Sequence, residues 1–171
     1  QFIDPYVSVV DIDVDGDLDL FVMAGYEVGI DARFARIFYN EEGSFTESDP
    51  EITAKGFGHA EWGDFDSDGD LDFLVCGAGD NVDVAKVYNN VSGTFTDISA
   101  LLTPIKGGGQ GHWGDYNNDG QLDIIIVGQN YGSKIYLNSN GDFNDYTSAP
   151  LQQGREANVD GGDYDGDGDL D

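Results

Sequence analysis

The sequence feature that most constrains the fold is a nine-residue pattern that occurs four times along the chain. The copies occupy residues 11–19, 64–72, 115–123 and 163–171, so their first residues are 53, 51 and 48 positions apart. Each copy has glycine at position six, leucine at position eight and an apolar or aromatic residue at position two. Self-similarity with a period of roughly 20–50 residues is typical of solenoids, propellers and other repeat arrays.

Each copy also places an oxygen-bearing residue at every odd position, which favours a hard cation. Carboxylates at positions one, three and five can converge, position seven can offer its main-chain carbonyl, and position nine can complete the roughly six to eight oxygen ligands that Ca²⁺ takes. Without a cation, two such charges about 4 Å apart repel by roughly 4 kcal/mol at an effective dielectric constant near 20. We therefore predict up to four bound Ca²⁺ ions, one in each loop.

The predicted calcium ligands are the odd positions of all four loops. Five aspartates occupy these positions in the first, second and fourth loops, whereas the third loop has asparagine and glutamine at positions three and seven. The ligands are Asp11, Asp13, Asp15, Asp17 and Asp19; Asp64, Asp66, Asp68, Asp70 and Asp72; Asp115, Asn117, Asp119, Gln121 and Asp123; and Asp163, Asp165, Asp167, Asp169 and Asp171.

An EF-hand or dockerin loop begins with the same spacing of acidic residues, but the sequence departs from it at position twelve. An EF-hand has a bidentate glutamate there, and this chain has Val22, Val75 and Ile126. Each of these residues lies in a short apolar run that is rich in β-branched residues, as expected for a buried strand. The pattern therefore predicts calcium loops within β-hairpins.

The charge of the chain excludes one class of partner. It has 34 acidic and 7 basic residues and a net charge of −27, whereas a nucleic-acid binder needs a basic surface.

Cys76 is the only cysteine, so no intramolecular disulfide can form. We expect no membrane span, because no apolar run reaches the ~18 residues that a spanning helix needs. Loops of this kind work where calcium is plentiful, so we expect an extracellular protein, secreted or at the cell surface.

Aligning the copies predicts four strands in each repeat and no helix. One strand leads into the loop and a second leaves it, and a third ends in the asparagine at Asn40, Asn90 or Asn138. A glycine follows each asparagine by three residues, and a phenylalanine two residues further on opens a fourth strand, as in a β-hairpin. Four antiparallel strands repeated about every 50 residues describe a β-propeller blade.

The motif W-G-D-x-D-x-D-G-D-L-D, followed by hY-x-N-x-x-G-x-F, resembles the FG-GAP/VCBS repeats, which build the integrin α-subunit propeller and several lectins and secreted adhesins. The resemblance covers essentially the whole chain. It implies calcium between the first and second strands of each blade, on the face opposite the usual ligand surface, and a role in cell adhesion or lectin-like recognition. The third loop departs from the motif at Asn117 and Gln121.

The expected fold is all-β, a single propeller region over residues 1–171. We expect full blades at about 1–52, 56–104 and 106–152, and the start of a fourth blade at 155–171. Propellers usually close with about four to eight blades. We therefore expect an incomplete propeller that is completed by other copies in a homo-oligomer or by the remainder of a longer chain.

Two other sets of residues deserve a prediction. Arg36, Lys86 and Lys134 share one position on the third strand, and we expect each to pair with a neighbouring acid. His59 and His112 stand five and three residues before their loops, so we interpret them as first-strand residues facing a channel or an edge. A pair of catalytic carboxylates, as in glycosidases, stays open, because it requires only a suitable separation.

Specificity is expected in the connections between second and third strands, which differ in length and content among the repeats, because binding residues often lie on variable loops of a rigid scaffold. The predicted ligand contacts are Tyr26, Arg33, Phe34, Asn81, Asp83, Gln129, Asn130 and Tyr131.

These features together predict a non-catalytic extracellular module that binds a protein or carbohydrate ligand through the face away from the calcium loops. One alternative is a self-assembling subunit of a surface assembly or filament. Another is an accessory module of a secreted hydrolase or lyase.

Overall fold

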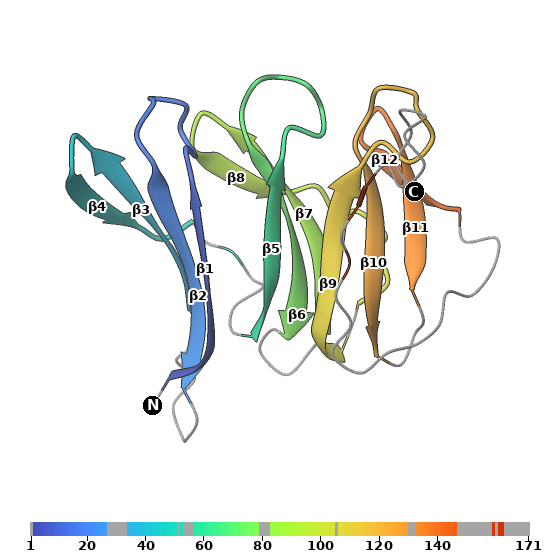
Figure 1. Ribbon diagram of the computed structural model, residues 1–171, viewed down its shortest axis with the longest axis horizontal. Coiled ribbons are helices and arrows are strands. Elements are labelled where there is room, and N and C mark those ends of the chain that lie inside the picture. Colours follow the sequence, from blue (N-terminus) through green and yellow to red (C-terminus); the bar gives the residue numbers. More distant parts are fainter. Residues whose placement is uncertain are drawn as a thin grey trace.

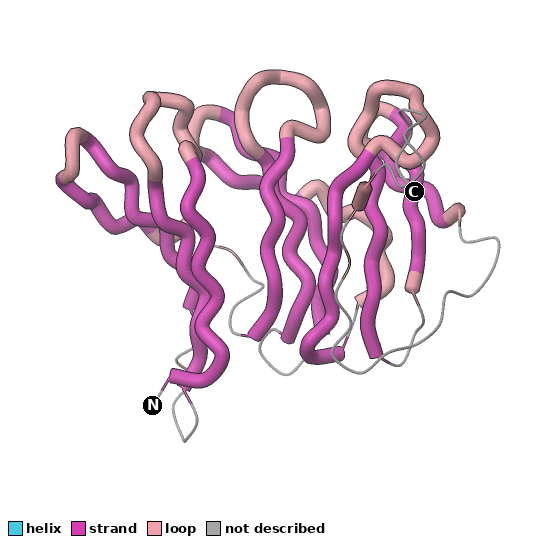
Figure 2. The backbone as a smooth tube through the Cα atoms, in the orientation of Figure 1, coloured by secondary structure: helices cyan, strands magenta, loops and turns pink. Residues whose placement is uncertain are grey.

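The computed structural model describes residues 2–26, 34–50, 52, 57–78, 83–104, 106–129, 133–146, 159, 161 and 162. These residues form twelve strands in three four-stranded antiparallel sheets, and the described part of the chain contains no helix (Figures 1 and 2). The predicted all-β propeller fold of four-stranded blades is confirmed. The fourth loop, at 163–171, lies outside the described residues.

Each sheet is one repeat, with its strands in sequence order from the inner edge to the outer edge. The first blade has β1 (Phe2–Val10), β2 (Asp19–Tyr26), β3 (Phe34–Glu41) and β4 (Ser44–Ser48). The second has β5 (Phe57–Gly63), β6 (Asp72–Ala78), β7 (Asp83–Val91) and β8 (Thr94–Asp97). The third has β9 (Lys106–Gly114), β10 (Asp123–Gln129), β11 (Lys134–Ser139) and β12 (Asp142–Asp145).

The nine-residue loops join the first and second strands of each blade and lie together at one end of the sheets (Figure 1). The second strands run from these loops to the opposite end of the sheets, where the connections to the third strands begin. The two predicted functional regions therefore lie at opposite ends of the blades.

The third and fourth strands are joined by two-residue turns in which both residues have positive φ. In the first blade these residues are Glu42 and Gly43, with φ of 51° and 88°. This conformation matches the right-handed twist of a hairpin, and it explains the glycine at this position of each repeat. The Asn40 side chain supports the turn by accepting a hydrogen bond from the Gly43 N–H at 2.8 Å.

The hydrophobic core lies between neighbouring blades. Phe73 and Val75 of β6 belong to the core against the first blade, whereas Leu74 and Cys76 belong to the core against the third. This alternation follows from the two-residue period of a strand. The middle blade is therefore covered on both faces, which explains why the second strands are continuous apolar runs.

The inner strands lie close together. A Cβ atom on Gly111 of β9 would lie 2.4 Å from Leu74 Cδ2 and 3.0 Å from Cys76 Sγ, so a larger residue would push the blades apart. Trp62 Nε1 of β5 donates a hydrogen bond to Ser8 Oγ of β1 at 2.9 Å. The small residues of the first strands, such as Gly111 and Ser8, thus permit the inner strands to pack closely.

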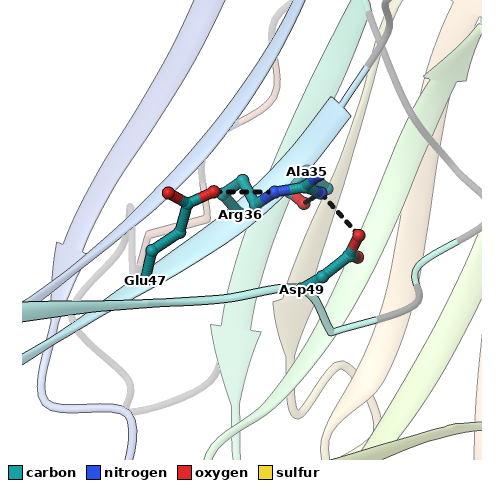
Figure 3. Close-up of polar contacts among 4 residues, drawn as sticks. All are labelled: Ala35, Arg36, Glu47 and Asp49. Atoms are coloured by element: carbon teal, nitrogen blue, oxygen red, sulfur yellow. Dashed lines mark hydrogen bonds and ion pairs between the residues drawn. The ribbon is translucent and has the colours of Figure 1, made fainter.

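The basic residues of the third strands pair with acids, as predicted. Arg36 Nε lies 3.0 Å from Glu47 Oε1, and its Nη1 lies 2.9 Å from Asp49 Oδ2 (Figure 3). At the same position of the other blades, Lys86 pairs with Asp97 at 2.6 Å and Lys134 pairs with Asp145. These partners lie on or next to the fourth strands, so the pairs join the two outer strands of each blade.

Candidate functional site

Carboxylate oxygens converge in the first two loops. One oxygen from each of Asp11, Asp13 and Asp15 lies within 4.8 Å of the others in the first loop. In the second loop, Asp64, Asp66 and Asp72 form a similar group. Positions one and three contribute in both loops. These distances bring three negative charges within reach of a single cation.

The main chain of the second loop folds around its first aspartate. Asp64 Oδ1 accepts a hydrogen bond from the Asp68 N–H at 3.0 Å, and its Oδ2 accepts one from the Gly69 N–H at 3.1 Å. Asp11 and Asp115 accept the same two bonds in their own loops. The loops therefore share one shape, which is set by local hydrogen bonds and places the odd positions on the inner side of the turn.

Two positions of each loop require a left-handed backbone. Position six has φ of 100° at Gly16, 97° at Gly69 and 85° at Gly120, which glycine adopts without steric cost. Position four has φ of 59° at Val14 and 62° at Ser67. The left-handed conformation is unfavourable for Val14, because a β-branched residue is rarely found in this region.

The aspartate at position nine is buried. Asp19, Asp72 and Asp123 each have an exposed fraction of 0%. Asp72 Oδ2 accepts a hydrogen bond from Phe65 N–H at 3.0 Å, and its Oδ1 accepts one from Asn90 N–H at 2.7 Å. The carboxylate thus ties the loop to the third strand, in addition to its predicted role as a ligand.

Burial raises the pKa of Asp72 to about 7, despite these two hydrogen bonds, and the charges of Asp66 and Asp68 raise it further. The pKa of Asp123 is also raised, mainly by burial. A raised pKa means that the surroundings disfavour the ionised carboxylate. A cation next to Asp72 would reverse this effect, so the electrostatics of the loop fit a bound metal ion.

The side chain at position seven has a role that the sequence analysis missed. Asp17 and Asp70 accept hydrogen bonds at 2.7 Å from the main-chain N–H of Glu42 and Ser92, which lie in the turns between the third and fourth strands. In the third loop, Gln121 Oε1 accepts the same bond from Asn140 N–H at 2.8 Å. Glutamine therefore preserves the link between loop and turn without a charge.

The third loop differs at position three. Asn117 Oδ1 accepts a hydrogen bond from Asp119 N–H at 2.9 Å, while its Nδ2 donates to Asp119 Oδ2 at 3.0 Å. The equivalent Asp66 has no donor in its side chain, and it accepts from Asp68 N–H at 3.3 Å and from Asn89 Nδ2 at 2.7 Å. The Asn117 amide thus adds a donor to the Asp119 carboxylate, which also accepts hydrogen bonds from the main-chain N–H and the side-chain amide of Gln121.

The asparagine that ends the third strand connects two blades. Asn90 Nδ2 donates to the main-chain carbonyl of Leu71 in its own loop at 3.0 Å and to that of Ile12 in the preceding loop at 3.4 Å. Asn138 repeats this arrangement with the carbonyls of Leu122 and Phe65, at 3.1 and 3.2 Å. The repeat of this asparagine was visible in the sequence, but its bond to the neighbouring blade was not.

The predicted ligand contacts are described only in part. Phe34 and Asp83 begin β3 and β7, and Tyr26 and Gln129 end β2 and β10. All four therefore lie at the end of the sheets opposite the nine-residue loops (Figure 1). Arg33, Asn81, Asn130 and Tyr131 lie outside the described residues.

A cavity of about 470 Å³ lies among the inner strands β1, β5 and β9. It brings together His59 and His112, which the sequence analysis interpreted as first-strand residues facing a channel or an edge. Their meeting depends on how neighbouring blades pack, which no local sequence signal reports. Burial lowers the pKa of His59, and nearby His112 lowers it further, so His59 is neutral at physiological pH.

Within the described part of the chain, no helix is long and apolar enough to cross a membrane.

The repeats match a known family. The FG-GAP-like repeat family matches residues 11–75, 64–126 and 115–171. No curated protein gives a significant match. Among solved structures, the chain is similar to an Agrocybe aegerita lectin, whose structure is described as the basis of specific recognition of non-reducing terminal N-acetylglucosamine. The two share 20% identity and a TM-score of 0.49, and the match covers 82% of this chain and 36% of the lectin chain.

Proposed function

Because this chain belongs to the FG-GAP-like repeat family, we propose that it is a calcium-stabilised, non-catalytic recognition module that acts outside the cell. It binds a protein or a glycan through the end of its blades opposite the calcium loops. Calcium at the other end keeps the blades in place, and the ligand does not contact it. The predicted blade limits and the single propeller region are part of this proposal.

The observation that carries the proposal is the group of oxygens from Asp64, Asp66 and Asp72 within 4.8 Å of one another. The loop contains no lysine or arginine that could neutralise them, and oxygen ligands of this kind suit a hard cation such as Ca²⁺. We assign the ligands to the odd positions of each loop, with position seven contributing its main-chain carbonyl.

The surface for recognition is assigned to the connections that follow the second strands. They differ among the blades in length and residue type, whereas the nine-residue loops keep one length, the same glycine and leucine, and an oxygen-bearing residue at every odd position. Variation on a constant scaffold favours ligand specificity. An absence of catalysis is supported by the carboxylates themselves, because most of the conspicuous acids lie in the loops and bond to main-chain N–H groups there.

A second candidate function, assembly through sheet faces, is favoured by the open face of the first blade. Val9 and Phe45 have exposed fractions of 57% and 52%. They stand where the second blade has Trp62 and Phe95, two rings that pack into the core shared with the first blade. A further blade, from another copy or from the rest of a longer chain, would cover this face. The accessory role beside a secreted hydrolase or lyase rests on no separate observation.

A binding screen tests the main proposal. The purified chain is applied to a glycan and protein array in 2 mM CaCl₂, and again after chelation and return of calcium, with ~2 mM chosen as a level well above the dissociation constants of most sensor sites. We expect binding that is lost in chelator and restored by calcium. Turnover of a polysaccharide, abolished by a single carboxylate substitution, would contradict the non-catalytic assignment.

A further inference from the structure

The cavity among the inner strands is lined by residues that differ from blade to blade. Tyr6, His59 and Gln110 each stand five residues before the first aspartate of their loop, and all three line the cavity. Three residues before the loop, the second and third blades have Glu61 and His112, which also line it. Repeats that share the spacing of their loops therefore differ in the residues that line this cavity.

Several polar groups of the cavity are held in fixed positions. His112 Nδ1 lies 3.1 Å from the Tyr116 hydroxyl, and His112 Nε2 lies 3.6 Å from Glu61 Oε1. The main-chain carbonyl of Glu61 accepts a hydrogen bond from Trp113 Nε1 at 3.1 Å. The imidazole of His112 and the main chain that carries Glu61 are therefore positioned before any ligand arrives.

Aromatic residues also line the cavity. The Tyr6 hydroxyl donates to the carbonyl of Ala60, and the ring of Tyr6 meets that of His59 edge to face, with centroids 5.1 Å apart. Trp62 adds a second aromatic side chain to the lining. Its indole also packs against Phe21 and Phe73 in the core between the first two blades, with ring centroids 5.5 and 5.1 Å away.

One buried polar atom of this wall lacks a partner. His59 Nδ1 is inaccessible to solvent and has no hydrogen-bond partner among the residues that the structure describes. An unsatisfied buried polar atom costs free energy and calls for an explanation.

We propose that this cavity binds a single uncharged sugar residue. A sugar ring has hydroxyl groups that both donate and accept, which the carboxylate of Glu61, the amide of Gln110 and the imidazole of His59 can match. Its C–H faces can lie against Tyr6 and Trp62, in keeping with ligand sites that combine aromatic walls with a few placed polar groups. A volume of about 470 Å³ accommodates one sugar ring.

Charge selects against acidic sugars. Glu61 faces the cavity, and the whole chain has a net charge of −27. No lysine or arginine is among the residues that line the described cavity, so a uronate or sialate would meet no fixed positive charge. The site lies among the inner strands, apart from the variable connections, and the inference goes beyond the proposed function without depending on it.

The test uses the calcium-loaded chain and methyl glycosides of glucose, galactose, mannose, N-acetylglucosamine and glucuronic acid. Binding is measured by isothermal titration calorimetry on the unaltered chain, and the emission of Trp62 is followed separately in a Trp113→Phe variant, whose affinity is first compared with that of the unaltered chain because Trp113 Nε1 bonds to the Glu61 carbonyl. We expect at least one uncharged glycoside to bind and to change the Trp62 emission. The glucuronide should bind at least tenfold more weakly.

Glu61→Gln and Gln110→Ala should each weaken the binding of that glycoside at least tenfold. The matched control is Glu47→Gln, which removes a carboxylate from β4 far from the cavity and should leave the affinity unchanged. The inference is overturned if no uncharged glycoside binds at tens of millimolar, or if binding is unchanged in both cavity variants. If a glycoside still binds unchanged in both cavity variants, the sugar binds elsewhere on the chain. That result would overturn this inference but not the proposed recognition function.

Discussion

Asn90 on β7 donates a hydrogen bond to the main-chain carbonyl of Ile12, 3.4 Å away in the nine-residue loop of the preceding blade. The same side chain also bonds to its own loop at Leu71 and to the following turn at Gly93. A single amide therefore joins two candidate metal loops. Because Ile12 is fully buried between the blades, a structural change in one loop should alter the packing of the next loop.

Removing calcium should destabilise the whole chain. A free calcium concentration of about 100 times the dissociation constant contributes roughly 2.7 kcal/mol for each occupied site, and about 1 kcal/mol shifts the Tm of a domain of this size by about 2–4 °C. We expect excess EDTA to lower the Tm by about 10 °C or more in calorimetry, and returned Ca²⁺ to restore it. An unchanged melting curve would refute the stabilising role of the loops.

The third loop should bind calcium most weakly among the described loops. Asn117 removes one charge from the ligand set, and affinity in such loops depends on the number of charged ligands and on rigidity. Asn117→Asp should tighten the weakest site about tenfold in a calcium titration. The control is Asn144→Asp, which adds the same charge on β12 and should have little effect. A third site that is already the tightest would show that charge does not rank the loops.

The bond between blades can be measured with matched substitutions. Asn40 and Asn90 make the same contacts within their blades, but Asn90 is fully buried and also reaches the preceding loop. Asn90→Ala should therefore lower the free energy of unfolding by about 1 kcal/mol more than Asn40→Ala, the usual net value of one hydrogen bond. Urea denaturation in calcium measures this difference, and equal losses would remove the role given to the Ile12 contact.

The left-handed conformation at position four predicts a stabilising substitution. Val14 has φ of 59° and is 57% exposed, so its side chain gains little packing in return for the strain. Val14→Asn should raise the free energy of unfolding by about 1 kcal/mol, since left-handed geometry costs roughly that much in a residue with a branched side chain. Ser67→Asn, at the same position of the second loop, should give a smaller gain. A destabilised V14N would contradict the strain.

The pH dependence of stability should differ with and without calcium. The pKa of Asp72 is about 7 in the folded chain and 3.8 in the unfolded chain, so between these values the folded state binds more protons. In chelator, stability should therefore fall as pH rises from about 4 to about 7. With saturating Ca²⁺ the ion favours the ionised carboxylate, so stability should rise with pH up to about 5 and then stay level instead of falling. Parallel curves with and without calcium would exclude Asp72 from the ligand set.

Local patterns in the sequence predict the features that are built from local interactions. The loops, the two-residue turns and the pairing of Arg36 with acids on the adjacent strand all follow from residues at fixed spacing. The bond from position seven to the turn, as at Asp17, joins segments 25 residues apart and gave no separate signal. The cavity could not be predicted from local patterns, because His59 and Gln110 come together only when the blades have packed.

The burial of the middle blade on both faces has a consequence for amide hydrogen exchange. In repeat architectures each unit is stabilised mainly by its neighbours, and regions with fewer buried contacts open at a lower free energy. The amides of β6, between the two cores, should exchange with solvent deuterium last. Those of β4, where Phe45 lies exposed, should exchange early. The protection of the chain would then decline outward from its second blade, so that opening of an outer blade need not expose the central one.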